Sequence, residues 1–516
     1  MFPAKIHRRI YLALLTLLGG CMVTSTWASN LVWVLLGVNW LLEGRWREKW
    51  QLLRESRLLQ AFIGLYLLLL AGMLWTENQS FGWSLLQVKL PLLCVPLVLL
   101  TTRPPAGRVR QGILWLYVAT VLVVSVIGLV RMLTIPDLPY RSAVPYISHI
   151  RFALNCCMAV YLCAAVAVKN RSVLQKAVAV LVLLWLLGFI LLLHSYTAVA
   201  ILLVVSLVTL LAYYRRWPLI ALWVLLVGGF AFAVGHEVHA YYRMSPLATA
   251  PLRATTASGN PYFHACDGIV ENGNYVNNYI SSYELRREWN RRSALPYDSS
   301  TASGYSVEST LVRYLNSLGL TKDSAGIATL TDAQLAAVER GVANAEYESG
   351  NPLRRMVYVM LFERENYVHT RAVAGFTMLQ RLELWNATLQ VIGDHPWLGV
   401  GTGDVVDAMQ HHLAAADSEL SGRGMRSHNQ YLGLLAAVGA VGFALALFLF
   451  VRPLFGRRRA MASALMTAWL LTVLISMLTE DTLDTLAGIL FCTWLLAFRP
   501  SAPSKGDTDD KSPQGT

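Results

Sequence analysis

A histidine lies directly before a long apolar block of the sequence, in the run Arg426-Ser427-His428-Asn429. Histidine exchanges protons near neutral pH, so at a sheltered but wet boundary it can act as a general base on a hydroxyl group. Histidine at a helix start is also a common structural hydrogen-bonding residue. The surrounding pattern has to decide between the two. If His428 is catalytic, we expect its neighbours Arg426 and Asn429 to bind substrate.

The residues after this histidine follow a fixed spacing. His428-Asn429 is followed by nine residues, Gly439, two residues and Gly442. Small residues within an apolar helix let a neighbouring helix approach closely. We therefore expect both glycines to lie at a helix–helix contact.

Upstream, Arg381 and Trp385 are separated by three residues on a predicted helix. A guanidinium group is always charged and holds phosphate oxygens through parallel N–H donors. Arg381 is therefore a candidate phosphate ligand. The alternative is a surface arginine that meets water or lipid headgroups.

A glycine-rich run follows, Pro396-x-x-Gly399-x-Gly401-x-Gly403, with Asp404 directly after it. Such a run can form a backbone nest for phosphate, but a glycine-rich turn alone is a weak signal. We expect a tight turn, with Asp404 as the N-cap of the next helix.

Taken together, H-N-x9-G-x2-G and the upstream R-x3-W and P-x-x-G-x-G-x-G strings resemble the signature of the O-antigen ligase and O-antigen polymerase superfamily. The resemblance implies that His428 is catalytic and that Arg381 binds the pyrophosphate of an undecaprenyl-diphosphate-linked glycan. It implies transfer of that glycan to a periplasmic acceptor hydroxyl such as that of lipid A–core, without metal, ATP or another cofactor. O-antigen polymerases and protein O-oligosaccharyltransferases share the motif, and only the acceptor separates them.

One expected arginine is missing. Ligases of this superfamily carry a second arginine in an external turn that reads S-R-x, whereas the corresponding turn here is His194-Ser-Tyr196-Thr197. Arg151, in Ser148-His-Ile-Arg151, is costly at the outer start of a span unless it is paired or functional. It is either a second phosphate ligand or an arginine that extends to the interface. Arg151 and His194 are the candidates to replace the missing arginine.

Three other groups of polar residues are expected to have structural roles. His236 and His239 resemble half of a metal motif, but without a third ligand we expect no metal. Lys89, inside a span, and Glu480 with Asp481, at the outer end of another, are expected to form local ion pairs or to lie at the membrane interface.

The amino-acid composition indicates the kind of structure that positions these residues. Hydrophobic residues make up 55% of the 516 residues and charged residues 14%, with a mean hydropathy of +0.46. The apolar residues form blocks of the length that crosses a bilayer as helix, without the alternation of a β-barrel. We expect about twelve spans: Ile10–Ser25, Leu31–Leu42, Leu58–Trp75, Leu85–Thr101, Gly112–Leu133, Ile150–Val168, Val173–Leu193, Ala198–Tyr213, Trp217–Gly235, Asn429–Val451, Ala460–Leu478 and Leu483–Phe498.

The net charge of +12 follows this topology. Every second connection is basic, including the run Arg457 to Arg459, which is the positive-inside pattern. Both termini are therefore expected in the cytoplasm of a bacterial cell, with the spans in its inner membrane. The charge indicates no nucleic-acid partner.

The segment between the ninth and tenth spans is the largest connection. We divide the chain into spans one to nine (1–235), a large periplasmic loop (236–427), spans ten to twelve (428–498) and a disordered cytoplasmic tail (499–516). Helical stripes, including Leu311 to Leu318 before Gly319 and a capping box from Thr331 to Gln334, predict that the loop is a folded helical cap. The fold expected is an all-α polytopic membrane protein, and the resemblance implies a GT-C-like glycosyltransferase.

A membrane transporter or lipid flippase is the alternative from another class. Transporters commonly show internal repeats and broken helices with charges at mid-membrane. The sequence shows no convincing repeat, few charges within spans and one oversized loop. The enzyme is therefore favoured, and loss of activity on His428→Ala would separate the two.

Overall fold

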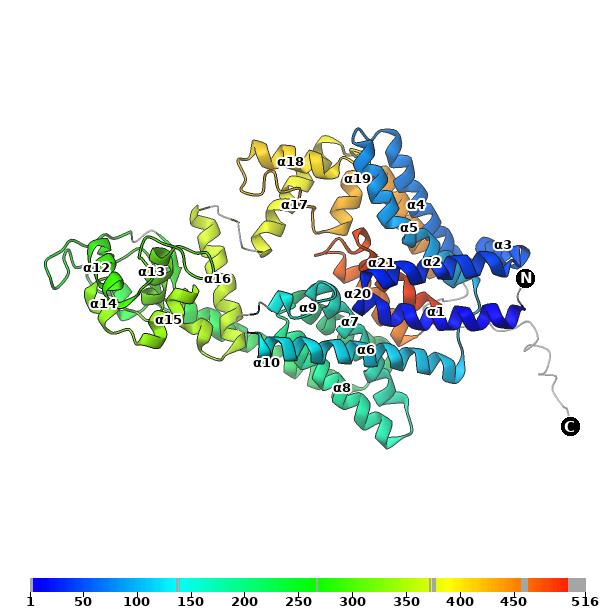
Figure 1. Cartoon of the computed structure of the whole chain (residues 1–516), viewed down its shortest axis with the longest axis horizontal. Helices are drawn as coiled ribbons and strands as arrows, with labels where there is room; N and C mark the ends of the chain where they lie inside the picture. Colours follow the sequence, from blue (N-terminus) through cyan, green and yellow to red (C-terminus); the bar gives the residue numbers. More distant parts are fainter. Residues whose placement is uncertain are drawn as a thin grey trace. The chain divides into compact units, whose positions relative to one another are not determined.

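The computed structural model describes residues 3–135, 138, 140–265, 268–370, 373, 377–455 and 463–499. The chain forms two compact units, residues 1–220 with 381–516 (the first unit) and residues 221–380 (the second unit). The structure is 73% helical, which makes the chain an all-α polytopic membrane protein (Figure 1). Cys266, Arg457 to Arg459 and the expected tail from residue 500 lie outside the described residues.

Helices account for nearly all of the first unit. In chain order they are α1 (Ala4–Thr24), α2 (Thr26–Glu43), α3 (Trp46–Glu55), α4 (Arg57–Ala71), η1 (Gly72–Leu74), α5 (Gln79–Thr101), α6 (Gly107–Thr134), η2 (Tyr140–Ser142), α7 (His149–Lys169), α8 (Val173–Leu192), α9 (Tyr196–Thr209), η3 (Leu210–Tyr214), α17 (Thr377–Asp394), α18 (Val405–Ala415), α19 (Gln430–Val451), η5 (Arg452–Phe455), α20 (Ala464–Ser476), η6 (Thr482–Asp484), α21 (Leu486–Trp494) and η7 (Leu495–Phe498). Helix α10 (Trp217–Tyr242) begins at the boundary and continues into the second unit.

Each predicted apolar block contains a helix. In the described part of the chain, nine helices are long and apolar enough to cross a membrane: α1, α4 with η1, α5, α6, α7, α8, α9 with η3, α10 and α19. Helices α20 and α21 with η7 are apolar but shorter. Helix α10 continues to Tyr242, so the predicted end at Gly235 is too early.

Short polar residues set the starts of several spans. Ser25 accepts the N–H of Ala28 at 3.1 Å before α2, and Ser56 accepts that of Leu59 at 3.2 Å before α4. The Asn78 side chain accepts the N–H of Phe81 at 3.1 Å before α5. These caps satisfy donors that a helix start leaves open, so consecutive spans turn back within few residues.

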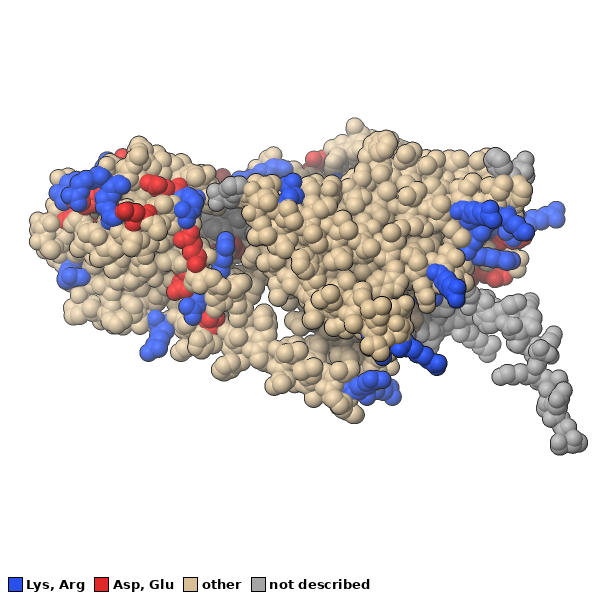
Figure 2. All heavy atoms as spheres, turned by 60° about the horizontal axis from the view of Figure 1, so that its bottom comes forward, with Lys and Arg blue, Asp and Glu red and all other residues tan. Residues whose placement is uncertain are grey.

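Helix α7 lies at the centre of the first unit. Phe152, Cys156, Cys157 and Met158 on this helix are fully buried, and α7 packs on α6, α8, α9 and α20. Figure 2 shows a broad stretch of this unit's surface without charged side chains, as expected for helices that face lipid. The apolar exterior surrounds a buried core that also holds Arg151.

The second unit has its own core. Its elements after α10 are α11 (Pro246–Thr249), β1 (Val270–Glu271), β2 (Asn274–Tyr275), α12 (Ser282–Arg292), α13 (Val307–Ser317), α14 (Ser324–Ala328), α15 (Asp332–Arg340), η4 (Ala345–Glu348) and α16 (Pro352–Thr370). Strands β1 and β2 pair antiparallel, with Val270 opposite Tyr275. Asn272 and Gly273 join them with φ of 52° and 71°, the geometry of a two-residue hairpin turn.

The helical features predicted for this region are present. Helix α13 is followed by Gly319 with φ of 68°, and α15 carries the Thr331–Gln334 capping box and ends at Gly341 with φ of 95°. The fully buried Glu271 carboxylate accepts hydrogen bonds from Arg313 and Asn344. The second unit is therefore a folded helical body with satisfied buried charge.

Candidate active site

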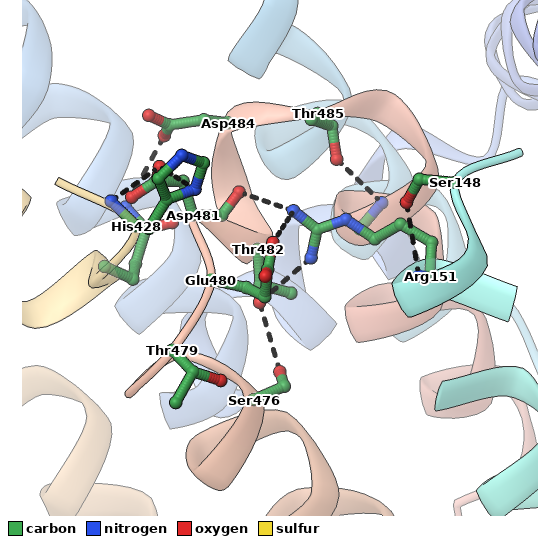
Figure 3. Close-up of polar contacts among 12 residues, drawn as sticks. Ser148, Arg151, His428, Ser476, Thr479, Glu480, Asp481, Thr482, Asp484 and Thr485 are labelled. Carbon is green, nitrogen blue, oxygen red and sulfur yellow. Dashed lines mark hydrogen bonds and ion pairs between the residues drawn. The ribbon is translucent and has the colours of Figure 1, made fainter. Parts of the chain in front are cut away.

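One short connection gathers the polar residues of the first unit. The segment between α20 and α21 carries Glu480, Asp481 and Asp484, and each carboxylate faces a base from another part of the chain. Figure 3 shows this segment passing between His428 on one side and Arg151 on the other. Acidic groups in such apolar surroundings require partners, and here the partners are the residues with candidate chemical roles.

His428 is held against Asp481. Its backbone N–H donates to Asp481 Oδ2 at 3.1 Å, and its Nδ1 lies 3.7 Å from the same oxygen. The Ser427 hydroxyl donates to Asp481 Oδ1 at 3.3 Å. His428 has a φ of 49°, a conformation that non-glycine residues rarely adopt and that this carboxylate stabilises.

The surroundings of Asp481 favour a proton on its carboxyl. Burial and the nearby Asp484 raise the pKa of Asp481, while His428 and Arg426 pull it back. A buried carboxylate is stabilised by positive charge beside it. The arrangement resembles a general base, His428, whose imidazole ring is oriented by a neighbouring carboxylate, that of Asp481.

Arg151 and Arg381 meet at Glu480. Arg381 donates to one carboxylate oxygen of Glu480, and Arg151 lies 3.8 Å from the other. Arg151 is buried and also donates to the Asp481 carbonyl at 3.0 Å and the Thr482 hydroxyl at 3.2 Å. Arg151 therefore does not extend to the surface, and it lies in one cluster with Arg381.

Arg426 and Lys89 share the third carboxylate. Lys89 on α5 is buried and forms an ion pair with Asp484, and Arg426 lies 3.5 Å from the other oxygen of that carboxylate. Arg426 is only partly buried. The local ion pair expected for Lys89 is present, and its partner is Asp484.

Asn429 has a structural contact that the sequence analysis did not assign to it. Its side-chain oxygen accepts the N–H groups of Tyr431 at 3.0 Å and Leu432 at 3.1 Å, which makes it the N-cap of α19. This cap accounts for an asparagine directly after His428 without any substrate.

Gly439 does not serve the helix–helix contact predicted for it. It breaks α19 with φ of 64° and ψ of −176°, and a Cβ there would lie 2.3 Å from the Trp397 carbonyl. The break lets the N–H groups of Ala440 and Val441 donate to the carbonyls of Pro396 and Trp397. Gly442 is closer to the expectation, because its Cβ position lies 3.2 Å from Leu68 on α4.

The glycine run is a tight turn, as predicted, and it packs on backbone. The N–H groups of Val400 and Gly401 donate to Ala436 and Ala437 on α19. Asp404 is the N-cap residue of α18, as predicted, but its carboxylate makes no cap bond and instead accepts the N–H groups of Glu77 and Asn78 at 2.8 and 2.7 Å. Helix α19 thus packs on α4, and the turn between α17 and α18 is bonded to α19 and to the residues before α5 (Figure 1).

A cavity adjoins the cluster. Lys89, Arg426, Asp481 and Asp484 line an open space of about 80 Å³ whose other wall is formed by apolar residues of α4, α5 and α19. An apolar groove of about 380 Å³ lies between α4, α19, α20 and α21, and Gln430 lines both spaces. A charged pocket therefore lies next to a groove with apolar walls.

The start of α9, which carries Tyr196 and Thr197, lies near the same segment. The Thr197 and Thr479 hydroxyls are 3.2 Å apart, which places the start of α9 next to the residue before Glu480. His194, in the turn before α9, has a φ of 50°. Tyr196 occupies the position where the superfamily pattern predicts an arginine, and this part of the chain thus lies close to the site.

The ion pairs expected for Glu480 and Asp481 are present, and their partners are residues with candidate chemical roles from other parts of the chain. The signal in the sequence for a role beyond local pairing is the density of acidic residues in an apolar protein.

No metal site is formed by the residues that the structure describes. They contain no group of three or more His, Cys, Asp and Glu placed to hold an ion. Glu237, between His236 and His239, pairs with Arg354 at 2.8 Å.

Comparison with known proteins adds one finding. Residues 327–447 match a family model described as O-antigen ligase, and this range includes Arg381 and His428. No curated protein matches the chain. The match supports a glycan ligase or polymerase type of function in lipopolysaccharide biosynthesis, carried out by a membrane glycosyltransferase or ligase. It supports membership of this chain in the O-antigen ligase superfamily.

Proposed function

We propose that the protein transfers a glycan from undecaprenyl diphosphate to an acceptor hydroxyl, such as that of lipid A–core, at the periplasmic face of a bacterial inner membrane. The observation that carries the proposal is the contact of His428, which lies inside the matched region, with Asp481, beside two arginines gathered at Glu480. The lipid-linked diphosphate supplies the driving force, so the reaction needs no ATP, metal or other cofactor.

His428 is the general base in this proposal. It takes the proton of the acceptor hydroxyl as the hydroxyl oxygen forms a bond to the anomeric carbon of the glycan. The bond from that carbon to the phosphate oxygen breaks, and the electron pair leaves with undecaprenyl diphosphate. Asp481 stabilises the imidazolium that forms, since its carboxylate lies 3.7 Å from Nδ1.

Arg381 and Arg151 bind and neutralise the departing diphosphate. Charge that develops on a leaving group is stabilised most by donors already in place, especially where water is excluded. Arg151 is buried and fixed by its hydrogen bonds to the Asp481 carbonyl and the Thr482 hydroxyl, which suits this role.

The two adjoining spaces suit a lipid-linked substrate. An isoprenoid chain fits the groove with apolar walls, and the adjoining polar pocket, lined by Lys89 and Arg426, can admit polar parts of the substrate. Asp484 already pairs with both cations, so the pocket is not a free cationic surface.

The test is reconstitution of the purified protein with undecaprenyl-diphosphate-linked glycan and lipid A–core, without ATP and with a chelator present. Wild type is compared with His428→Ala and Arg381→Ala. His412→Ala is the matched control, because His412 also faces a carboxylate, that of Asp394 at 3.0 Å, but away from the site.

Glycan on lipid A–core with wild type and the control, and none with His428→Ala, is the expected result. Longer carrier-linked chains would identify a polymerase, and glycan on an added protein acceptor would identify a protein ligase. No transfer by wild type, with carrier movement across vesicles unaffected by His428→Ala, would refute the enzyme and favour a transporter.

A further inference from the structure

Glu480 lies between the guanidinium groups of Arg381 and Arg151. Its side chain is 10% exposed, one carboxylate oxygen accepts a hydrogen bond from Arg381, and the other lies 3.8 Å from Arg151. Arg151 makes its hydrogen bonds to neutral oxygens of Asp481 and Thr482. The carboxylate therefore sits where a ligand with two anionic oxygens would meet both guanidinium groups.

Two donors on α17 lack acceptors. The Nε of Arg381 and the indole Nε1 of Trp385 are buried and have no hydrogen-bond partner among the described residues. The two residues are one helical turn apart and so lie on the same face of α17. Native proteins rarely leave buried donors unpaired, and two of them on one face indicate a missing acceptor.

The cluster also carries more positive than negative charges. Among the described residues of the connection and its partners, the cations Lys89, Arg151, Arg381 and Arg426 face the carboxylates of Glu480, Asp481 and Asp484. One positive charge is left over, even with His428 neutral. Buried surplus charge is unfavourable until an anion of higher charge than a carboxylate binds.

We propose that Glu480 is a built-in stand-in for the diphosphate of the donor, and that the diphosphate displaces it from Arg381 and Arg151 while accepting the N–H of Trp385. The inference rests on the proposed function for the identity of the anion. It assigns a binding role to Trp385 and a competing role to Glu480. Donor binding is then an exchange of one anion for another, so weakly charged anions do not open the site.

The test measures binding of inorganic pyrophosphate to the full-length protein in detergent by isothermal titration calorimetry. Glu480→Gln removes the competing charge and is expected to bind pyrophosphate about tenfold tighter than wild type. Trp385→Phe keeps the ring, removes the N–H and is expected to bind about tenfold weaker. Glu348→Gln is the matched control, since it removes an exposed carboxylate that pairs with Arg340 and leaves affinity unchanged.

Glu480→Asp covers the case in which Glu480→Gln does not fold. It keeps the charge but withdraws the carboxylate by one methylene, so pyrophosphate is expected to bind tighter than to wild type. Unchanged or weaker binding by a folded Glu480 variant, or unchanged binding by folded Trp385→Phe, overturns the inference.

This readout is separate from catalysis. A protein that transfers glycan normally, but whose Glu480→Gln variant binds pyrophosphate no tighter, overturns the stand-in role and leaves the proposed function intact. Tighter binding by Glu480→Gln in a protein that transfers no glycan supports the anion site and refutes the proposed reaction.

Discussion

The carboxylate of Asp481 contacts His428 through both its backbone and its side chain. Oδ2 accepts the backbone N–H at 3.1 Å and lies 3.7 Å from Nδ1. The carboxylate thus favours a proton on Nδ1 and leaves Nε2 as the nitrogen that accepts a proton from a substrate. It also stabilises the left-handed backbone of His428, a conformation that costs about 1–3 kcal/mol.

Asp481→Asn is therefore expected to lower the transfer rate by roughly 10²-fold, because the imidazolium loses its counter-charge. Stability should not fall with the rate. A carboxyl with a raised pKa makes the folded protein bind its proton more tightly, a contribution present at low pH and lost as pH rises through the folded-state pKa. The neutral asparagine avoids that loss.

Parallel measurement of the pH–rate profile and the unfolding temperature checks this expectation. Wild-type activity should fall on the acid side as Asp481 takes up its proton, and the variant should lack that dependence on Asp481. A variant with wild-type rate and profile would show that Asp481 only shapes the backbone.

Gly439→Ala is expected to disrupt the break in α19. The backbone conformation at φ of 64° and ψ of −176° is nearly exclusive to glycine and costs other residues about 1–3 kcal/mol. The added Cβ would also lie 2.3 Å from the Trp397 carbonyl, so the variant should unfold at a clearly lower temperature in detergent. Gly188→Ala, in α8 with open space around it, is the control and should leave this temperature unchanged. Equal stability of the two variants would contradict the role of the break.

Lys89→Met tests the buried ion pair with Asp484. Removing one partner leaves a carboxylate in a mostly buried place, so we expect a loss of about 3 kcal/mol in unfolding free energy. The double variant Lys89→Met with Asp484→Asn removes the carboxylate that is left with only the partly exposed Arg426 as its partner, and should recover part of the loss. Urea unfolding of the detergent-solubilised variants measures both, and a double variant less stable than Lys89→Met alone would argue against the pair.

Glu284→Gln tests the buried carboxylate of the second unit. Burial alone would raise the pKa of Glu284, but hydrogen bonds from Ser324, Thr256 and Asn260 lower it to about 2. The folded state thus favours the charged form, a contribution present above pH 4.5 and lost as pH falls toward 2.

The glutamine variant should lose about 1–3 kcal/mol of local stability at pH 7 and less at pH 3. Hydrogen exchange of the α12 amides, followed by mass spectrometry on the full-length protein, measures the difference. Glu348→Gln, which alters an exposed pair, should show no such pH dependence. Equal losses at both pH values would contradict the hydrogen-bonded charge.

Hydropathy predicted the spans because bilayer thickness sets their length, so each apolar block from Ile10 to Phe498 contains a helix. Local signals also located the Thr331 cap and the Gly341 end of α15. The end of α10 was missed, because Glu237 and His239 read as loop although Glu237 pairs with Arg354 on α16.

The motif residues of the site could be predicted from the sequence, but the contacts that bring them together could not. The spacing singled out His428 and Arg381, yet nothing local connects them to Glu480 and Asp481, which lie more than fifty residues further on than His428. Gly439 was misread because an apolar helix with a small residue looks the same whether the helix continues or breaks. Only the pairing of its neighbours with Pro396 and Trp397 reveals the break.

The most direct test of the account is the transfer rate of His428→Ala, measured with and without free imidazole in the reconstituted system. If His428 is the base, the variant should lose about 10²–10⁴-fold in rate, and imidazole should restore part of it by accepting the acceptor's proton. A variant that transfers glycan at the wild-type rate without imidazole would contradict the central claim.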